Sequence, residues 1–174
     1  MVYPIIAYGH PVLKKPAEDI VKEEVDVKAL VADMFETMYN ANGIGLAAPQ
    51  IGKSLQDEEI GEWRQVFINP EIIEEHGEKW AFEEGCLSIP HIREDVSRQP
   101  KVKIHYFDEN WEEHTDEFDG MQARIIQHEY DHIEGILFTD HISAFKRRLL
   151  KSKLTNISKG IVKADYRMSF PKKR

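Results

Sequence analysis

Apolar residues in the N-terminal part of the chain recur at intervals of three and four positions, the period of an α-helix with one buried face. The residues with this spacing are Val27, Leu30, Val31, Met34, Phe35 and Met38. Asn42-Gly43 interrupts the pattern, as turn-forming residues do after a helix. We therefore predict a helix over about residues 25–41. The preceding residues 1–20 contain three prolines and should form an extended arm with turns.

The middle of the chain shows the alternation typical of half-buried β-strands. Residues 101–107 alternate strictly and end at a polar turn, so residues 114–118 are expected to pair back as a hairpin. An earlier strand covers residues 65–70, which either ends at Asn69-Pro70 or continues over residues 71–74. This region is therefore predicted to be mainly β.

Helical spacing returns after Asp119-Gly120, first over about residues 121–133 and again from Ser143 to about Gly160. One helix, several antiparallel strands and then two helices indicate the α+β class. We expect antiparallel β-sheets packed around the central helix, together with an N-terminal and a C-terminal helix. The length of 174 residues fits a single domain, 1–174.

Charge is distributed unevenly along the chain. The net charge is −8, yet residues 143–174 carry eleven Lys or Arg side chains against one acid, Asp165. An acidic body with a basic C-terminal tail, about residues 160–174, could approach a phosphate-rich surface. The alternative is a solvated helix face followed by a frayed end.

Signals for a membrane or for export are not evident. No apolar run approaches the roughly 18 residues of a membrane span, and the first residues lack a basic region followed by an apolar stretch. Cys86 is the only cysteine, so no internal disulfide can form, which fits a reducing compartment. We expect a cytoplasmic location.

Residues 127–132, Gln-His-Glu-Tyr-Asp-His, place a His-Glu-x-x-His pattern in the predicted central helix. His128 and His132 would project from one helix face, at a spacing that lets two imidazoles bind one metal ion. Glu129 lies one step round the helix and could act as a general base on a metal-bound water. The alternative is an ordinary helix that carries two histidines.

The identity of the third metal ligand distinguishes between the classes of metalloenzyme that use this helix motif. Zinc peptidases with this helix usually use a downstream glutamate, or a histidine six residues after the second one, but no glutamate follows Glu134 and position 138 is phenylalanine. Cys86, next to glycine at the end of a presumed strand, could supply a thiolate. It could also be a small buried hydrophobic residue. The downstream candidates are Asp140, His141 and Asp165.

Residues 43–50, Gly-Ile-Gly-Leu-Ala-Ala-Pro-Gln, combine small side chains as a cleft wall close to a ligand's main chain would require. With Glu-Gly-Cys-Leu-Ser at 84–88 and the motif at 127–132, this stretch resembles the three signature motifs of bacterial peptide deformylase. Residues 8–13, Tyr-Gly-His-Pro-Val-Leu, match the family's N-terminal arm. The resemblance covers nearly the whole chain.

The resemblance implies removal of the formyl group from the N-terminal formylmethionine of nascent polypeptides, with release of formate. Glu129 would take the proton of the attacking water and pass it to the departing amine. The side-chain amide of Gln50 and the backbone N–H of Leu87 would support the developing oxyanion. One divalent metal ion would be held by three side chains, Cys86, His128 and His132.

The substrate residues are also implied by the resemblance. Ile44 and Gly85 would pair with the substrate main chain like an added strand, and Gly45 would let the substrate come close. Arg93 would lie near the mouth of the site. Arg124 occupies a lining position that is usually apolar in the family, which leaves its direction open. The methionine pocket would be lined by Ile44, Phe82, Met121, Ile125 and the flank of His128.

Cofactor and partners follow in the same way. The resemblance implies Fe²⁺ in the cell, with Zn²⁺, Ni²⁺ or Co²⁺ as substitutes, and a Cys-His-His set suits these ions by ligand softness. The expected partners are formylmethionyl nascent peptides and the ribosome, the latter through the basic tail at about residues 160–174. We expect no membrane association and a monomer.

The chain departs from the family pattern after Gln50. An apolar strand is expected there, but residues 51–55 lead directly into the acidic run at 56–59. Either most of that strand is lost, or residues are missing from the sequence between Leu55 and Gln65. We favour the second explanation, because deleting a strand beside Gln50 should damage the site.

Two other functions stay open. A zinc peptidase is one, although its usual downstream glutamate is absent. The other is a non-enzymatic protein that binds nucleic acid or the ribosome and carries a structural metal. Structural sites normally have four protein ligands, whereas the motifs supply three, which favours catalysis.

Overall fold

The computed structural model describes the chain apart from residues 54, 56, 61–63 and 173–174. Its described strands form a five-stranded antiparallel sheet, a β-hairpin and a two-residue parallel pair. The five-stranded sheet has the order β2 (Gly45–Ala47), β3 (Asp57–Ile60), β4 (Gln65–His76), β7 (Lys101–Phe107) and β8 (Glu113–Asp119). The hairpin joins β5 (Trp80–Cys86) to β6 (Ile89–Arg98), and the parallel pair joins β1 (Ile5–Ile6) to β9 (Met168–Ser169).

The described α-helices are α1 (Val27–Asn40), α2 (Gly120–Ile133), α3 (Phe138–His141) and α4 (Ala144–Ser158), with 3₁₀ turns at Pro11–Lys14 and Ala48–Ile51. Side-chain caps begin two of them: the Asp26 carboxylate accepts a hydrogen bond from the N–H of Ala29, and the Ser143 hydroxyl accepts one from the N–H of Lys146. Among the helices described, none is both long and apolar enough to cross a membrane.

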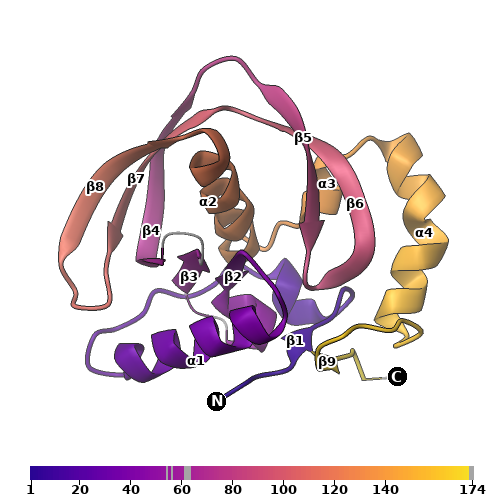
Figure 1. Ribbon diagram of the computed structural model, residues 1–174, viewed down its shortest axis with the longest axis horizontal. Helices are drawn as coiled ribbons and strands as arrows, with labels where there is room; N and C mark the ends of the chain where they lie inside the picture. Colours follow the sequence, from indigo (N-terminus) through magenta and orange to yellow (C-terminus); the bar gives the residue numbers. More distant parts are fainter. Residues whose placement is uncertain (54, 56, 61–63, 173–174) are drawn as a thin grey trace.

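Helix α2 occupies the centre of the molecule, between β4, β7 and β8 on one side and the β5–β6 hairpin on the other (Figure 1). On the sheet side, Ala123 and Ile126 pack in one buried cluster with Phe67 and Ile104. Polar residues of α2 are buried as well, including His128, Glu129 and His132. A helix enclosed on two sides carries its polar side chains into the interior, where they require partners.

The α+β class with antiparallel sheets is confirmed. The helix predicted over residues 25–41 corresponds to α1, and all six of its periodic apolar residues are buried in one cluster with Leu46 and Ile68. The predicted hairpin corresponds to β7 and β8, which pair with Ile104 opposite Asp116. Hydrophobic periodicity located these elements because each buries one face against the core.

Strand β4 runs through Asn69-Pro70 to His76. The prediction that this strand ends at Asn69-Pro70 is therefore wrong, and the prediction that it continues is confirmed. The register with β7 shifts between Ile68 and Glu71, a local irregularity that accommodates a proline with no N–H to donate. Asn69 adopts a left-handed backbone conformation, and its side-chain amide bonds the N–H and the carbonyl of Ile20. Asn69-Pro70 therefore marks a bulge in a longer strand.

The predicted shortening between Leu55 and Gln65 falls partly on residues 56 and 61–63, which lie outside the described residues. Within that segment, β3 pairs with both neighbouring strands, with Gly45 opposite Ile60 and Asp57 opposite Ile68. A short strand thus joins β2 to β4 in the chain as given.

The chain after α4 returns to the body of the protein. Strand β9 pairs with β1, close to the chain's first residues (Figure 1). Met168 and Phe170 pack against a buried cluster that includes Leu13 and Ile89. As far as Phe170, the segment predicted as a basic tail is therefore an integral part of the fold. No hydrophobic periodicity in the sequence indicated the two-residue strand that anchors it.

Candidate active site

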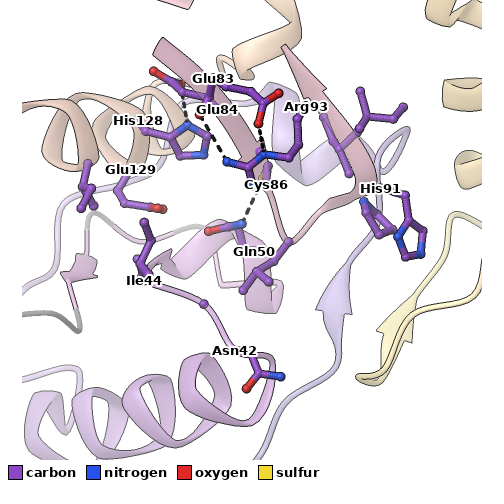
Figure 2. A pocket seen from close by; sticks show the side chains of 18 of the residues that line it. Asn42, Ile44, Gln50, Glu83, Glu84, Cys86, His91, Arg93, His128 and Glu129 are labelled. Carbon is purple, nitrogen blue, oxygen red and sulfur yellow. Dashed lines mark hydrogen bonds and ion pairs between the residues drawn. The ribbon is translucent and has the colours of Figure 1, made fainter. Parts of the chain in front are cut away.

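The cavity beside the three motif stretches has a volume of about 500 Å³, within the usual range for small-molecule sites. It is lined by residues from the loop before β2, from both strands of the hairpin, from α2 and from the C-terminal segment. Figure 2 shows His128, Glu129, Gln50 and Cys86 converging on it. The three motif stretches, far apart in the sequence, therefore meet at one site.

Three potential metal ligands come together in this site. The ligand atoms of Cys86, His128 and His132 all lie within 4.8 Å of one another. The two histidines are four residues apart on α2, and Cys86 ends β5. Its Sγ lies 3.3 Å from Nε2 of His132. A thiolate and two imidazoles suit a divalent transition metal, and three protein ligands leave a coordination position for substrate chemistry.

The carboxylate of Glu84 orients His128. Its Oε2 lies 2.9 Å from His128 Nδ1, an interaction that leaves Nε2 for a metal. The same carboxylate accepts hydrogen bonds from Arg98 at 2.7 and 3.0 Å and from Arg124 at 2.6 Å. Arg98 also donates to Asp131 at 2.9 Å, next to His132. A buried carboxylate between two guanidinium groups thus supports the face of α2 that carries the two predicted metal ligands.

Burial and hydrogen bonding set the charges in this network. Burial alone would raise the pKa of Glu84, but hydrogen bonds from His128 and Arg98 outweigh it and hold the pKa of that carboxyl well below its usual range. Burial lowers the pKa of His132 and so favours the neutral imidazole that binds metals. For His128, hydrogen bonds with Cys86 and Glu84 outweigh burial and raise the pKa of the imidazole. Surroundings that favour a positive charge here also favour a bound cation.

Glu129 is buried beside these ligands and is not used to hold the fold. Its Oε2 has no hydrogen-bond partner among the described atoms, and burial raises the pKa of its carboxyl to about 7. A Cβ on Gly45 would lie 2.4 Å from Glu129 Oε1, so only glycine leaves space for this carboxylate. A carboxyl with a pKa near neutrality can both accept and return a proton.

Gln50 and Leu87 place hydrogen-bond donors at the same site. The N–H of Ala47 donates to Gln50 Oε1 at 2.9 Å, which directs the amide nitrogen toward Cys86 Sγ at 3.5 Å and Ser88 Oγ at 3.3 Å. Leu87 follows Cys86 in the turn between β5 and β6 and lines the cavity. These two predicted donors therefore lie beside the predicted metal ligands.

The predicted substrate residues also line the cavity. Ile44, Phe82 and Met121 are large apolar side chains with exposed fractions of 54%, 40% and 38%, whereas Ile125 is buried. Such exposed apolar groups around a cavity mark a binding surface. The other predicted lining residues are Gly45, Gly85 and Arg93.

The two arginines of the site differ in role. Arg93 is exposed and pairs with Glu83, its Nε lying 2.7 Å from the carboxylate. Arg124, whose direction the sequence left open, is only 2% exposed. Its guanidinium donates to Glu84 and to the carbonyls of Val96 and Trp80, and lies 4.3 Å from the centre of the Trp80 ring. Arg124 is therefore held in the buried charge network.

Several residues that support the site lie outside the roles predicted from the sequence. Glu84 belongs to the second motif, and its position two residues before Cys86 is the signal that could have found it. Arg98 has no comparable signal, because its link to Glu84 depends on the pairing of β5 with β6. Tyr166 lines the cavity from the C-terminal segment, where no pattern indicated it.

Comparisons with known proteins agree with the motif resemblance. Residues 2–148 match the family described as polypeptide deformylase. The chain is 59% identical to a peptide deformylase of Cytophaga hutchinsonii, over 100% of both chains, and 57% identical to one of Christiangramia forsetii, over 98% of this chain and 97% of that protein. Its fold is similar to the crystal structure of peptide deformylase from Thermus thermophilus, with a TM-score of 0.86 and 37% identity over 92% of this chain and 100% of that one.

Proposed function

The chain belongs to the polypeptide deformylase family, and from this premise we propose that it hydrolyses the formamide bond at the N-terminus of formylmethionyl nascent polypeptides and releases formate. The observation that carries the proposal is the convergence of Cys86, His128 and His132 beside the cavity that Glu129 lines, where Oε2 of Glu129 has no hydrogen-bond partner among the described atoms. The family is metal-dependent, and these residues provide a possible metal site.

We propose that Cys86, His128 and His132 hold one divalent ion, Fe²⁺ in the cell with Zn²⁺, Ni²⁺ or Co²⁺ as substitutes. Such an ion supplies Lewis acidity that polarises the formyl group and acidifies a water. The sulfur and nitrogen ligand set is compatible with each of these metals. Glu84 would keep the His128 ring in its binding orientation through the Nδ1 contact.

Glu129 would act as the proton carrier. Its carboxylate takes a proton from the attacking water as the oxygen adds to the formyl carbon, and returns that proton to the amine nitrogen as the C–N bond breaks. A pKa of about 7 suits both steps. The side-chain N–H of Gln50 and the backbone N–H of Leu87 would donate to the oxygen that gains negative charge, and removing one such donor typically costs about 3–4 kcal/mol.

The substrate would bind as an added β-strand. Strand β2 pairs with β3 along one edge and β5 pairs with β6, and neither has a second neighbour among the described strands. Backbone groups for an extended peptide are therefore offered by Gly45 at the start of β2, by Ile44 directly before it and by Gly85 in β5. The exposed side chains of Phe82 and Met121, with Ile125, would receive the methionine side chain, and Arg93 would lie near the peptide beyond it.

The proposal is tested by formate release from a formyl-Met peptide, using protein purified without oxygen. We expect release that stops when the metal is removed with a chelator and returns when Fe²⁺ or Co²⁺ is added, because the metal activates the attacking water. The same peptide without its formyl group is the blank. A folded, metal-loaded protein that releases no formate, or release that survives complete metal removal, would contradict the proposal.

We also propose that the basic face of α4 contacts ribosomal RNA, so that the enzyme acts where nascent chains emerge. Arg147, Arg148 and Lys151 are all exposed on this face of the helix. The double variant Arg148→Glu/Lys151→Glu should bind ribosomes several-fold more weakly in low-salt cosedimentation, because phosphate contacts dominate such binding. Formate release from a free peptide should not change, which makes the two readouts independent. Equal cosedimentation of variant and wild type would exclude this surface of α4 as the ribosome contact.

The position of the C-terminal segment makes substitution on α4 a better test than deletion. Removing residues 160–174 would remove β9 and the three cavity-lining residues 164–166. A loss of ribosome binding could then reflect a damaged fold. The proposed setting is the cytoplasm, where new chains carry the formyl group. Since one chain supplies every residue of the proposed site, a monomer is sufficient for activity.

A further inference from the structure

The C-terminal segment forms one wall of the cavity. Ala164, Asp165 and Tyr166 line it together with the motif residues. The segment is fastened on both sides of this wall: the carbonyl of Lys163 contacts His91 of β6, and the carbonyls of Arg167 and Ser169 accept hydrogen bonds from the N–H groups of Ile5 at 2.8 Å and Ala7 at 2.9 Å. A segment held at both ends can place a side chain reproducibly.

The turn that follows β5 is held by both ends of the chain. This turn carries Cys86, a predicted metal ligand, and Leu87, whose N–H is a predicted oxyanion donor. The hydroxyl of Tyr166 donates to the carbonyl of Leu87 at 2.7 Å, and the N–H of Tyr8 donates to the carbonyl of Ser88 at 2.9 Å. Two successive carbonyls of the turn are therefore fixed by groups that lie far away in the sequence, one in each direction.

Tyr166 is suited to be a permanent donor. Burial raises the pKa of its phenol, so the hydroxyl keeps its proton in the working pH range. Its ring packs against the same core cluster as Leu87. In the proposed reaction, Tyr166 does not contact the reacting atoms.

We propose that Tyr166 is a positioning residue: its hydroxyl fixes the peptide planes around Leu87, so that the Leu87 N–H and Cys86 are held in the geometry that the reaction requires. A donor fixed before the reaction stabilises developing charge without reorganisation, and small displacements of such a donor reduce the rate more than they reduce binding. This inference rests on the proposed deformylase reaction. It adds a residue outside the three motifs to the site.

The test is Tyr166→Phe, which keeps the ring and removes the hydroxyl. We expect kcat for formate release to fall about five- to tenfold, since one hydrogen bond that helps the transition state is lost. KM for the formyl-Met peptide should change less than about twofold. Bound metal should stay at one ion per chain. Amide exchange at Leu87 and its neighbours, followed by NMR on the Zn²⁺-loaded protein, should be faster than in the wild type.

The matched control is Tyr3→Phe. Tyr3 packs against the same core cluster, and its hydroxyl interacts with Asp33, a residue that does not line the cavity. This variant should keep wild-type kcat and wild-type exchange at Leu87. An unchanged kcat in Tyr166→Phe, or an equal loss in both variants, would overturn the proposal. If the wild type releases no formate, the proposed reaction fails, and unchanged exchange at Leu87 would still reject the positioning role by itself.

Discussion

Replacing Glu129 with glutamine is expected to lower kcat for formate release by about a thousandfold, within the range for loss of a general acid–base group. The substitution keeps the size of the side chain but removes the group that accepts and returns the proton. Because Glu129 is not a predicted metal ligand, bound metal should remain at one ion per chain. Formate release and metal content measured on the same preparation check both statements.

Glu134→Gln is the control for this variant. Glu134 directly follows the last residue of α2 but is exposed and does not line the cavity. It should therefore retain wild-type kcat and an unchanged melting temperature. If Glu129→Gln keeps more than about a tenth of the wild-type rate, the proton-transfer role assigned to Glu129 is wrong. If the Glu129→Gln variant loses its metal, the measured rate no longer reports on proton transfer alone. In that case the prediction that metal is retained is the one that is wrong.

Replacing Glu84 with glutamine is expected to lower the free energy of unfolding by about 3–5 kcal/mol, the usual result of breaking a buried ion pair. The substitution leaves Arg124 buried without a compensating negative charge and leaves Arg98 with Asp131 alone. It also weakens the acceptor that orients His128, which should reduce metal affinity by about 10–100-fold. Urea unfolding of the metal-free protein and competition with a chelator measure the two effects separately.

Glu83→Gln provides a closely matched control. Glu83 lies next to Glu84 on β5 and also pairs with an arginine, Arg93, but its side chain is 59% exposed. Solvent screens such a pair, so we expect a loss of no more than about 1 kcal/mol. Equal destabilisation by the two variants would show that burial of the Glu84 network does not carry the stability assigned to it.

The two glutamates act at different levels of the site. Glu129 has one carboxylate oxygen, Oε2, without a hydrogen-bond partner among the described atoms, and it should affect the reaction with little effect on the fold. Glu84 has every carboxylate oxygen in a charged hydrogen bond and should affect the fold and the metal together. The chain thus separates a reactive carboxylate from a supporting one by hydrogen bonding alone, since both are buried.

Local periodicity was enough to predict α1, the β7–β8 hairpin and the α+β class, because each of these elements buries one regularly spaced face. The spacing of His128 and His132 likewise depends only on helix geometry. Such features are encoded over a few residues, so the sequence by itself determined them.

Other features depend on which distant strands and loops pack together, and only the tertiary structure decided them. Asn69-Pro70 signals a strand end locally, but pairing with β7 and the bonds to Ile20 continue β4 through a bulge. The direction of Arg124 follows from the position of Glu84 across the β5–β6 hairpin. Tyr166 reaches Leu87 only because β9 pairs with β1 at the other end of the chain. Contacts between residues so far apart in sequence produce no local periodicity, and for that reason no sequence pattern predicted them.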